Sequence, residues 1–159
     1  MTEKVLILDI DKCTGCRICE LACSFKKEGK FNPRLSRVHI LRLDTGVNVP
    51  ILCQHCEKPV CVAVCPTGAI KKDPVSGIVR INLEICNQCN RCIESCPVGA
   101  IQKHPLENFL MKCDLCGGTP ECVKECPANV LQLVVKNQTQ IDKRKIILKR
   151  LAKFKKFQS

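Results

Sequence analysis

Sixteen cysteines in four runs of four constrain the fold of this chain more than any other feature. The first and third runs have the spacing C-x2-C-x2-C-x3-C, and the second and fourth lengthen the middle gap to four and five residues. A proline follows the last cysteine of every run except the first. No cysteine lies outside the runs, which are Cys13-Cys16-Cys19-Cys23, Cys53-Cys56-Cys61-Cys65, Cys86-Cys89-Cys92-Cys96 and Cys113-Cys116-Cys122-Cys126.

The spacing of these runs indicates ligands for cubane [4Fe–4S] clusters. A cubane needs three thiolates on one tight loop and a fourth thiolate that approaches from another direction. The first and third runs have the spacing of bacterial ferredoxins, which Pro97 completes in the third run. The second and fourth runs keep the final C-x3-C-P, with Pro66 and Pro127. Four complete ligand sets follow from the four runs.

Disulfide bonds and structural zinc are the other common uses of closely spaced cysteines. A disulfide scaffold belongs to secreted proteins. Residues 1–25 show no signal peptide, because Met1–Lys4 leads into a short apolar segment and then into the first run. We therefore expect a reducing cytoplasm. Zinc needs only two C-x2-C pairs per ion, so it leaves the third cysteine of the tight runs and the recurring C-x3-C-P unexplained.

The composition predicts a thin hydrophobic core that depends on metal. The chain has 159 residues, with five Phe and no Trp or Tyr. Small domains of this kind need additional stabilisation by cross-links or bound metals, and metal clusters can provide it. We expect the fold to collapse without iron and sulfide. No stretch approaches the length of an apolar membrane span, so we expect a chain that is soluble by itself.

The formal charge of +11 counts the thiols as neutral. Four oxidised clusters contribute about −8, from sixteen thiolates and four cores of about +2, which brings the total to about +3. Residues 136–159 contain nine Lys or Arg and one Asp, which makes this tail +8 and leaves the cluster-loaded body near −5. We therefore expect an anionic body beside a strongly basic tail.

Repeated sequence predicts a repeated structural unit. The sequence CPTGAI at residues 65–70 recurs as CPVGAI at residues 96–101, and more loosely at residues 126–131. A short apolar strand that ends in an acid precedes the first and third runs, at Val5–Asp11 and Ile78–Glu84. The unit is a strand, a cluster loop, a short helix and a strand. Its repetition predicts an α+β fold.

Two such units pair in a two-cluster ferredoxin, where the fourth cysteine of each run ligates the other run's cluster. Spacing alone does not show which runs pair. The second and third are nearest and share their ending, so we expect residues 50–108, with a turn at residues 73–77, to form an inner dicluster ferredoxin-like module. Residues 1–49 and 109–135 then form a discontinuous outer dicluster module, followed by the basic tail 136–159.

Two features near the runs have more than one interpretation. Residues 25–49 form a long connection with a turn at residues 32–36, which either covers the outer module or contacts a partner. His55 lies between two cysteines of the second run, but all ligand positions are already filled. We expect His55 to line the cluster envelope, where its charge can tune the reduction potential.

The tail is predicted to contain a basic amphipathic helix from Ile141 to Phe157, with Ile147, Leu151 and Phe154 on one face. This apolar face either packs on the protein itself or accompanies a helix that docks to an acidic partner subunit. Membrane-surface or nucleic-acid binding is a third interpretation, which the scarcity of aromatic side chains for base stacking disfavours. The excess of positive charge over what the body needs favours a tail that reaches outward.

The order and content of the runs resemble the four-cluster iron–sulfur subunits of anaerobic oxidoreductases. The resemblance is carried by Cys-Gln-His-Cys in the second run and Lys-Cys-Asp-Leu-Cys-Gly-Gly in the fourth, and it covers about residues 5–134. The group includes electron-transfer subunits of dimethyl-sulfoxide-reductase-type enzymes and the ferredoxin-like partners of carbon monoxide dehydrogenase. Residues 28–37 and the compact length most resemble the small subunits of tungsten-dependent aldehyde oxidoreductases.

The resemblance implies a ligand set for each cluster, with three cysteines from one run and the fourth from its partner run. Some relatives lose a ligand and hold a three-iron cluster, but here every position is Cys, so four [4Fe–4S] clusters are expected. The implied sets are Cys13, Cys16 and Cys19 with Cys126; Cys113, Cys116 and Cys122 with Cys23; Cys53, Cys56 and Cys61 with Cys96; and Cys86, Cys89 and Cys92 with Cys65.

We expect a non-catalytic electron-transfer subunit. The sequence shows no nucleophile–base constellation, no glycine-rich phosphate loop and no metal site with an open position, whereas full cysteine ligation suits outer-sphere electron transfer. The resemblance implies a large catalytic partner, most closely a tungsten- or molybdenum-pterin aldehyde-type oxidoreductase, and a further redox acceptor. Alternatives are a partner of carbon monoxide dehydrogenase, hydrogenase or a dimethyl-sulfoxide-reductase-type enzyme, and a free polyferredoxin. A zinc-stabilised nucleic-acid-binding module is the alternative from another class.

Overall fold

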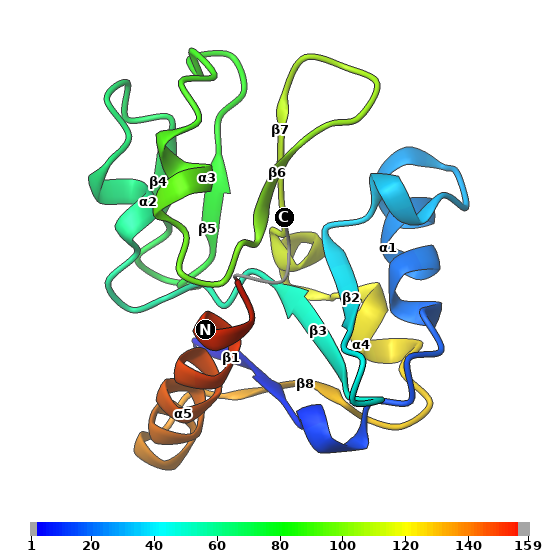
Figure 1. Ribbon diagram of the computed structural model, residues 1–159. Helices are drawn as coiled ribbons and strands as arrows, with labels where there is room; N and C mark the ends of the chain where they lie inside the picture. The colour runs from blue at the N-terminus through cyan, green and yellow to red at the C-terminus, as the bar shows by residue number, and fades with distance from the viewer. Residues whose placement is uncertain (1–2, 156–159) are drawn as a thin grey trace.

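The computed structural model describes residues 3–155 and shows short helices and strands joined by long cysteine-bearing loops (Figure 1). No helix in this part of the chain is long and apolar enough to cross a membrane. The strands are β1 (Lys4–Leu8), β2 (Val38–Arg42), β3 (Asn48–Leu52), β4 (Ile70–Lys72), β5 (Val79–Ile81), β6 (Ile101–Lys103), β7 (Leu110–Lys112) and β8 (Leu131–Val135). The α-helices are α1 (Ile18–Glu28), α2 (Val60–Ala63), α3 (Arg91–Ser95), α4 (Glu121–Lys124) and α5 (Gln138–Phe154), and 3-10 turns occupy Ile10–Lys12, Pro33–Leu35 and Leu115–Gly118.

The strands form antiparallel pairs, β1 with β8, β2 with β3, β4 with β5, and β6 with β7. The β1–β8 pair joins segments from opposite ends of the chain, with Leu6 opposite Leu133. The turn predicted between β4 and β5 is present, because the Asp73 carboxylate accepts hydrogen bonds from the N–H groups of Val75 (3.0 Å) and Ser76 (2.6 Å). Short strands, cysteine loops and short helices alternate as expected, and the α+β fold class is confirmed.

Cysteine side chains fill much of both hydrophobic cores. The larger core packs Leu6, Leu52 and Leu131 against six buried cysteines from all four runs, namely Cys19, Cys23, Cys53, Cys96, Cys113 and Cys122. The smaller core packs Ile70 and Ile101 against Cys92. A two-stranded sheet and a helix of four or five residues are marginal by themselves. We therefore expect these elements to need whatever the sulfur atoms bind for their stability.

Two strand pairs cross the predicted module boundaries. Val38 of β2 lies opposite Leu52 of β3, and these residues fall on either side of the boundary at residue 50. Lys103 of β6 lies opposite Leu110 of β7, across the boundary at residue 108. The first boundary thus lies within β3, and the second lies in the loop that joins the paired strands β6 and β7. The division into an inner and an outer module stays a prediction.

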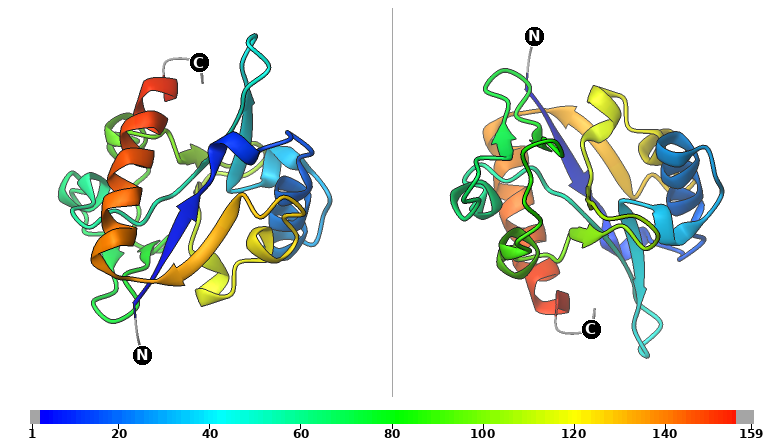
Figure 2. Two further views of the ribbon diagram at one scale, coloured as in Figure 1. Left: turned by 90° about the horizontal axis from the view of Figure 1, so that it is seen from below. Right: turned by 90° about the horizontal axis from the view of Figure 1, so that it is seen from above.

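The connection after the first run folds back on the body. α1 starts inside the run, continues to Glu28, and packs against α4. The Asn32 N–H then donates to Ser24 Oγ (3.2 Å), and Arg37 forms an ion pair with Glu28 (2.6 Å). This part of the connection covers the predicted outer module. The loop between β2 and β3 projects from the body (Figure 2).

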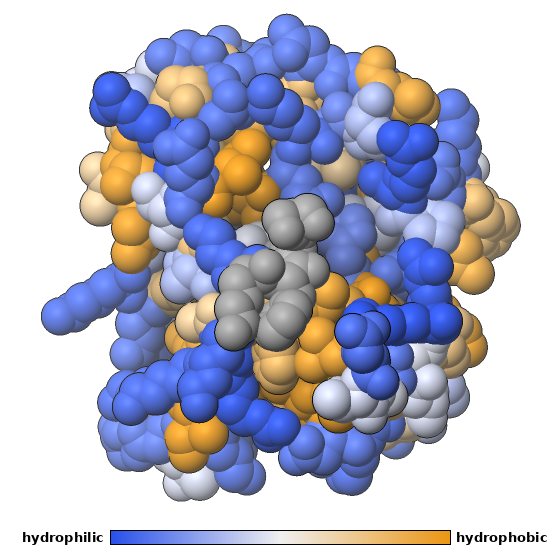
Figure 3. All heavy atoms as spheres, viewed as in Figure 1, coloured by the Kyte–Doolittle hydropathy of each residue, from blue (hydrophilic) through white to orange (hydrophobic). Residues whose placement is uncertain are grey.

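The C-terminal helix also folds back, so the outward arrangement that the charge favoured is wrong for residues up to 155. α5 packs against β1 and buries Ile147 and Leu151 in the larger core, with Phe154 partly buried against it. Burial of this apolar stripe is favourable, and it leaves most of the basic side chains on the solvent side, where hydrophilic residues cover the lower left of the molecule (Figure 3). Arg150 pairs with Asp11 (2.7 Å) across the surface. Phe157, the predicted end of this helix, lies outside the described residues.

Replacing Leu151 should therefore weaken the whole fold. Leu151 is 0% exposed, and a buried Leu→Ala change costs about 2–5 kcal/mol. The anaerobically prepared Leu151→Ala variant should unfold at a lower guanidinium concentration than the wild type, as followed by far-UV circular dichroism. Ile146→Ala is the matched control, because Ile146 on the same helix is 62% exposed and should change stability by less than about 0.5 kcal/mol. Equal midpoints for the two variants would contradict the packing of α5.

Candidate metal centres

Each cysteine run begins with the same backbone turn. The residue two positions after the first cysteine has a left-handed backbone in all four runs, with φ of 70° at Gly15, 44° at His55, 56° at Gln88 and 54° at Leu115. This turn brings the backbone N–H of that residue onto the cysteine sulfur, at 3.4 Å for His55 and Cys53 and at 3.4 Å for Leu115 and Cys113. An N–H donor on sulfur stabilises the thiolate. The loops are therefore shaped to present thiolates.

The end of three runs repeats a second turn. The third residue after the last cysteine has φ of 66° at Gly68, 67° at Gly99 and 49° at Asn129. The next N–H then reaches back to the sulfur, at 3.4 Å from Ala100 to Cys96 and 3.3 Å from Val130 to Cys126. Asn tolerates the left-handed region better than most residues. This explains why the same turn is kept in the fourth run, where Asn129 stands at the position of the glycine.

The first run ends differently because no proline follows Cys23. α1 continues through that position to Glu28, and Cys23 is buried within it. Its sulfur accepts a hydrogen bond from the Arg37 N–H at 3.3 Å, a donor that the folded-back connection supplies. The connection at residues 25–42 thus takes over the task that a local turn performs in the other runs.

The sulfur atoms from different runs come together in the interior. Cys13, Cys16, Cys19 and Cys126 line one cavity with Pro50 and Pro127. Burial, the Glu20 carboxylate and the thiols of Cys13, Cys16 and Cys126 raise the pKa of Cys19 to about 12. The last cysteine of the fourth run therefore lies with the first three cysteines of the first run.

The remaining cysteines form comparable groups. Burial and then the thiols of Cys113, Cys23, Cys19 and Cys116 raise the pKa of Cys122. In another group, burial raises the pKa of Cys61 to about 11, with contributions from Cys53, Cys96 and Cys56.

The group at the end of the inner region contains Cys92, whose pKa is raised by burial and then by Cys86 and Cys89. Cys65 lies near this group, because it lines a surface cavity with Arg91 and Glu94, where α2 meets α3. Its thiol approaches Thr67 Oγ1 at 3.7 Å.

The donor chemistry fits iron–sulfur clusters better than disulfides or zinc. All sixteen cysteines lie within the described residues and all are free thiols. Within residues 3–155, no three Cys, His, Asp or Glu side chains are arranged to hold a single metal ion. A structural zinc ion needs four ligands at about 2.0–2.3 Å from one centre, whereas a cubane places four irons between its sulfur ligands. Converging thiols with N–H donors on their sulfurs suit the larger group.

His55 does not carry the charge that the sequence suggested. It is buried, and its Nδ1 accepts a hydrogen bond from the Val79 N–H (2.9 Å). Burial, and then the positive charges of Lys112 and Arg144, lower its pKa well below the ordinary value. The imidazole is therefore neutral, and tuning by a histidinium is wrong. The charges beside the second run belong to Lys112 and Arg144. Neither residue is part of a sequence motif, so its position near the run could not be predicted from the sequence.

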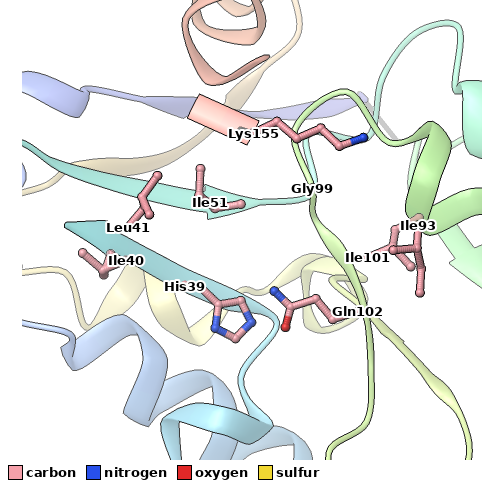
Figure 4. Close-up of a pocket in the computed structure, with 9 residues that line it drawn as sticks. All are labelled: His39, Ile40, Leu41, Ile51, Ile93, Gly99, Ile101, Gln102 and Lys155. Atoms are coloured by element: carbon pink, nitrogen blue, oxygen red, sulfur yellow. The ribbon is translucent and has the colours of Figure 1, made fainter. Parts of the chain in front are cut away.

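An open cavity elsewhere on the molecule is separate from the cysteine groups (Figure 4). Ile40 and Ile51 line it on one side and Ile93 and Ile101 on the other, so it lies between the β2–β3 hairpin and the α3–β6 region. Its polar edge comes from His39, Gln102 and Lys155. No cysteine lines this cavity, so it is not part of a metal centre.

Family models match both parts of the cysteine pattern. A model described as a 4Fe-4S dicluster domain matches residues 45–136, and one described as a 4Fe-4S binding domain matches residues 10–26. This protein belongs to the 4Fe-4S dicluster domain family. The matched residues of this dicluster protein include all sixteen cysteines.

Curated relatives and solved structures agree with this membership. The sequence is 41% identical over 129 residues to the polyferredoxin-like subunit of the aliphatic sulfonate oxidoreductase of Pyrococcus furiosus, covering 78% of this chain and 75% of that protein. It is 36% identical over 151 residues to one subunit of the anaerobic dimethyl sulfoxide reductase of Escherichia coli, covering 82% and 72%. The active site complex BamBC of benzoyl coenzyme A reductase contains a chain with 29% identity and a TM-score of 0.50, covering 92% and 90%.

The dicluster protein accordingly binds four [4Fe–4S] clusters and transfers electrons. It is an iron–sulfur subunit and not a catalytic one. The expected resemblance to iron–sulfur subunits of oxidoreductases is confirmed, and so are the expected cofactors.

Proposed function

We propose that this dicluster protein relays electrons between a large catalytic subunit, of the tungsten- or molybdenum-pterin oxidoreductase type, and a second redox acceptor. The single observation that carries the proposal is the convergence of thiols from different runs in the interior, as in the cavity that Cys13, Cys16, Cys19 and Cys126 line. The Pyrococcus furiosus relative, itself a polyferredoxin-like subunit of an oxidoreductase, supports a catalytic partner. The free thiols support a reducing compartment, and we propose the cytoplasm.

We further propose that each cluster takes its fourth ligand from a different run. The cavity shared by Cys13, Cys16, Cys19 and Cys126 supports the first set. The effects of Cys23 on Cys122 and of Cys96 on Cys61 support the second and third sets. The packing of Cys65 and Cys86 against the smaller core that contains Cys92 supports the fourth set.

The groups follow one another in a row. Cys19 of the first set is among the thiols that raise the pKa of Cys122 in the second set. Burial and then Cys53 of the third set raise the pKa of Cys113, also in the second set, to about 12. The fourth set adjoins the third because Cys61 of the third set packs against the same smaller core as Cys65, Cys86 and Cys92. When bound, the clusters supply one-electron transfer without a change of ligands. The order of the four sets defines the path that electrons follow through the molecule.

The two ends of the row reach the surface. Cys16 in the first set and Cys89 in the fourth set are exposed, whereas the second and third sets each contain at least two buried cysteines and no exposed one. Exposed apolar side chains lie close in sequence to both, namely Ile18 beside Cys16, and Leu83 and Ile85 before Cys89. We propose that the catalytic subunit and the second acceptor approach the opposite ends of the row.

The cross-ligation is tested by removing one fourth ligand at a time. Cys126→Ala should disturb the paramagnetic signal of the cluster held by Cys13, Cys16 and Cys19, because that cluster loses a thiolate. Cys65→Ala, the matched change at the other end, should disturb the cluster of Cys86, Cys89 and Cys92 and leave the first one intact. Spin-resonance spectra of the reduced variants distinguish the two. If both variants lose the same signal, the proposed ligand sets are wrong.

The catalytic partner is tested by anaerobic affinity purification of the tagged full-length protein from its native cells. A large subunit should co-purify in near-equal amount, and metal analysis of the complex should find tungsten or molybdenum in addition to iron. A complex with a large subunit but without either metal would contradict the pterin-enzyme assignment. Recovery of the fully iron-loaded protein alone would instead identify a free polyferredoxin.

A further inference from the structure

Two buried cations stand beside the second cysteine run. Arg144 on α5 is 4% exposed, and Lys112 at the end of β7 is 9% exposed. Arg and Lys are almost never fully buried unless they are paired. Yet within residues 3–155 no carboxylate forms an ion pair with either side chain. Some other negative charge must therefore offset the cost of burying them.

The hydrogen bonds of Arg144 place its guanidinium against the cysteine loop of the second run. Its guanidinium Nη2 donates to the backbone carbonyl of Gln54 and, at 3.0 Å, to the carbonyl of His55. These two residues lie between the ligands Cys53 and Cys56. Arg144 Nε has no hydrogen-bond partner among the described residues. The guanidinium is thus fixed against the cysteine loop, and its charge is only partly satisfied by neutral carbonyl groups.

Two lysine side chains add positive charge near this loop, and one of them binds it directly. Lys112 Nζ donates to the carbonyls of Val79 (2.6 Å) and Cys113 (2.9 Å). Lys72 Nζ donates to the carbonyl of Cys56 at 3.2 Å. Arg144 and Lys72 therefore bind the loop of the second run, and the charge of Lys112 acts on His55 and Cys61 in it.

The thiols of the run are opposite charges for Arg144 when they ionise. Burial lowers the pKa of Arg144, and Cys56, followed by Glu57, Glu3 and Cys53, acts against that effect. Lys112 in turn lowers the pKa of Cys61, although burial raises it overall. Arg144 and Lys112 thus act on three cysteines of one proposed ligand set.

We propose that Arg144 raises the reduction potential of the cluster held by Cys53, Cys56, Cys61 and Cys96, and that this is the task of the C-terminal helix in electron transfer. Reduction adds one negative charge to a cluster, and a fixed positive charge in a poorly solvated interior stabilises the reduced state more than the oxidised state. Lys112 and Lys72 add to this effect. The inference rests on the proposed ligand set.

The position of Arg144 in the sequence makes this a property of α5. The matches to the family models end at residue 136, whereas α5 begins at Gln138. Helix packing through Ile147 and Leu151 holds the guanidinium in place, and the Lys155 Nζ bond to the Glu94 carbonyl (2.7 Å) ties the end of the helix to α3. The buried stripe thus positions a charge as well as covering the body.

The test is a redox titration of the anaerobically prepared full-length protein, followed by spin resonance, for wild type, Arg144→Gln and Arg144→Lys. In Arg144→Gln, one of the four midpoint potentials should fall by at least about 59 mV, which is a tenfold change in a one-electron equilibrium. The other three should move far less. Arg144→Lys keeps the charge and should stay near the wild type. Lys143→Gln is the matched control, because this neighbour is exposed and loses the same charge into solvent.

Unchanged potentials in an iron-replete Arg144→Gln protein would overturn the proposal, and so would an equal shift in Lys143→Gln. If the Arg144→Gln protein loses iron, the Arg144→Lys protein serves as the test. Full iron content and a wild-type potential in Arg144→Lys would support an effect of the positive charge on the potential. Loss of iron in Arg144→Lys would show that the guanidinium has a purely structural role. The ligand set is checked separately: if the potential that Arg144→Gln shifts belongs to a signal that Cys96→Ala leaves intact, the ligand set is wrong and the charge effect stands.

Discussion

Bonds between cysteine sulfur and iron are the constraint on which the rest of this structure depends. The backbone elements are short: four two-stranded sheets, three α-helices of four or five residues and only two longer ones among residues 3–155. Such elements do not persist alone in water. Both cores combine aliphatic side chains with cysteines, so metal ligands occupy part of the hydrophobic interior. We therefore expect cluster binding to contribute to the free energy of folding of this protein.

The buried thiols must lose their protons before they can bind iron. Burial raises the pKa of Cys19 and Cys113 to about 12, so without iron these groups are protonated and contribute no charge. Iron binding requires thiolates and offsets the cost of ionising them in the interior. The repeated N–H donors at Cys53, Cys113, Cys96 and Cys126 stabilise the same thiolate state. The loops are thus prepared for the clusters by their backbone geometry.

Much of this could be predicted from the sequence, because cysteine spacing and turn residues are local signals. Short stretches of sequence are enough to predict the cysteine runs, the α+β class, the turn at Asp73 and the turns at the repeated CPxGA endings. The left-handed turns at His55, Gln88 and Leu115 were missed because only Gly15 carries the usual residue for that backbone. Lys112 and Arg144 were missed for a different reason. Their burial follows from contacts across 33 and 90 positions of sequence, which no local pattern reveals. The tail was misjudged because net charge was weighed above the burial of Ile147 and Leu151.

The central claim is that four cubane clusters stand in one row, each bounded by two cysteine runs. Diffraction from crystals of the anaerobically purified protein, measured on both sides of the iron absorption edge, tests it most directly. The account predicts four separate iron sites in sequence along the molecule, with about sixteen irons in all at four per cubane. It also predicts Cys126, Cys23, Cys96 and Cys65 each beside a site whose other three ligands come from a different run. Fewer than four iron sites, or a site bounded by a single run, would contradict it.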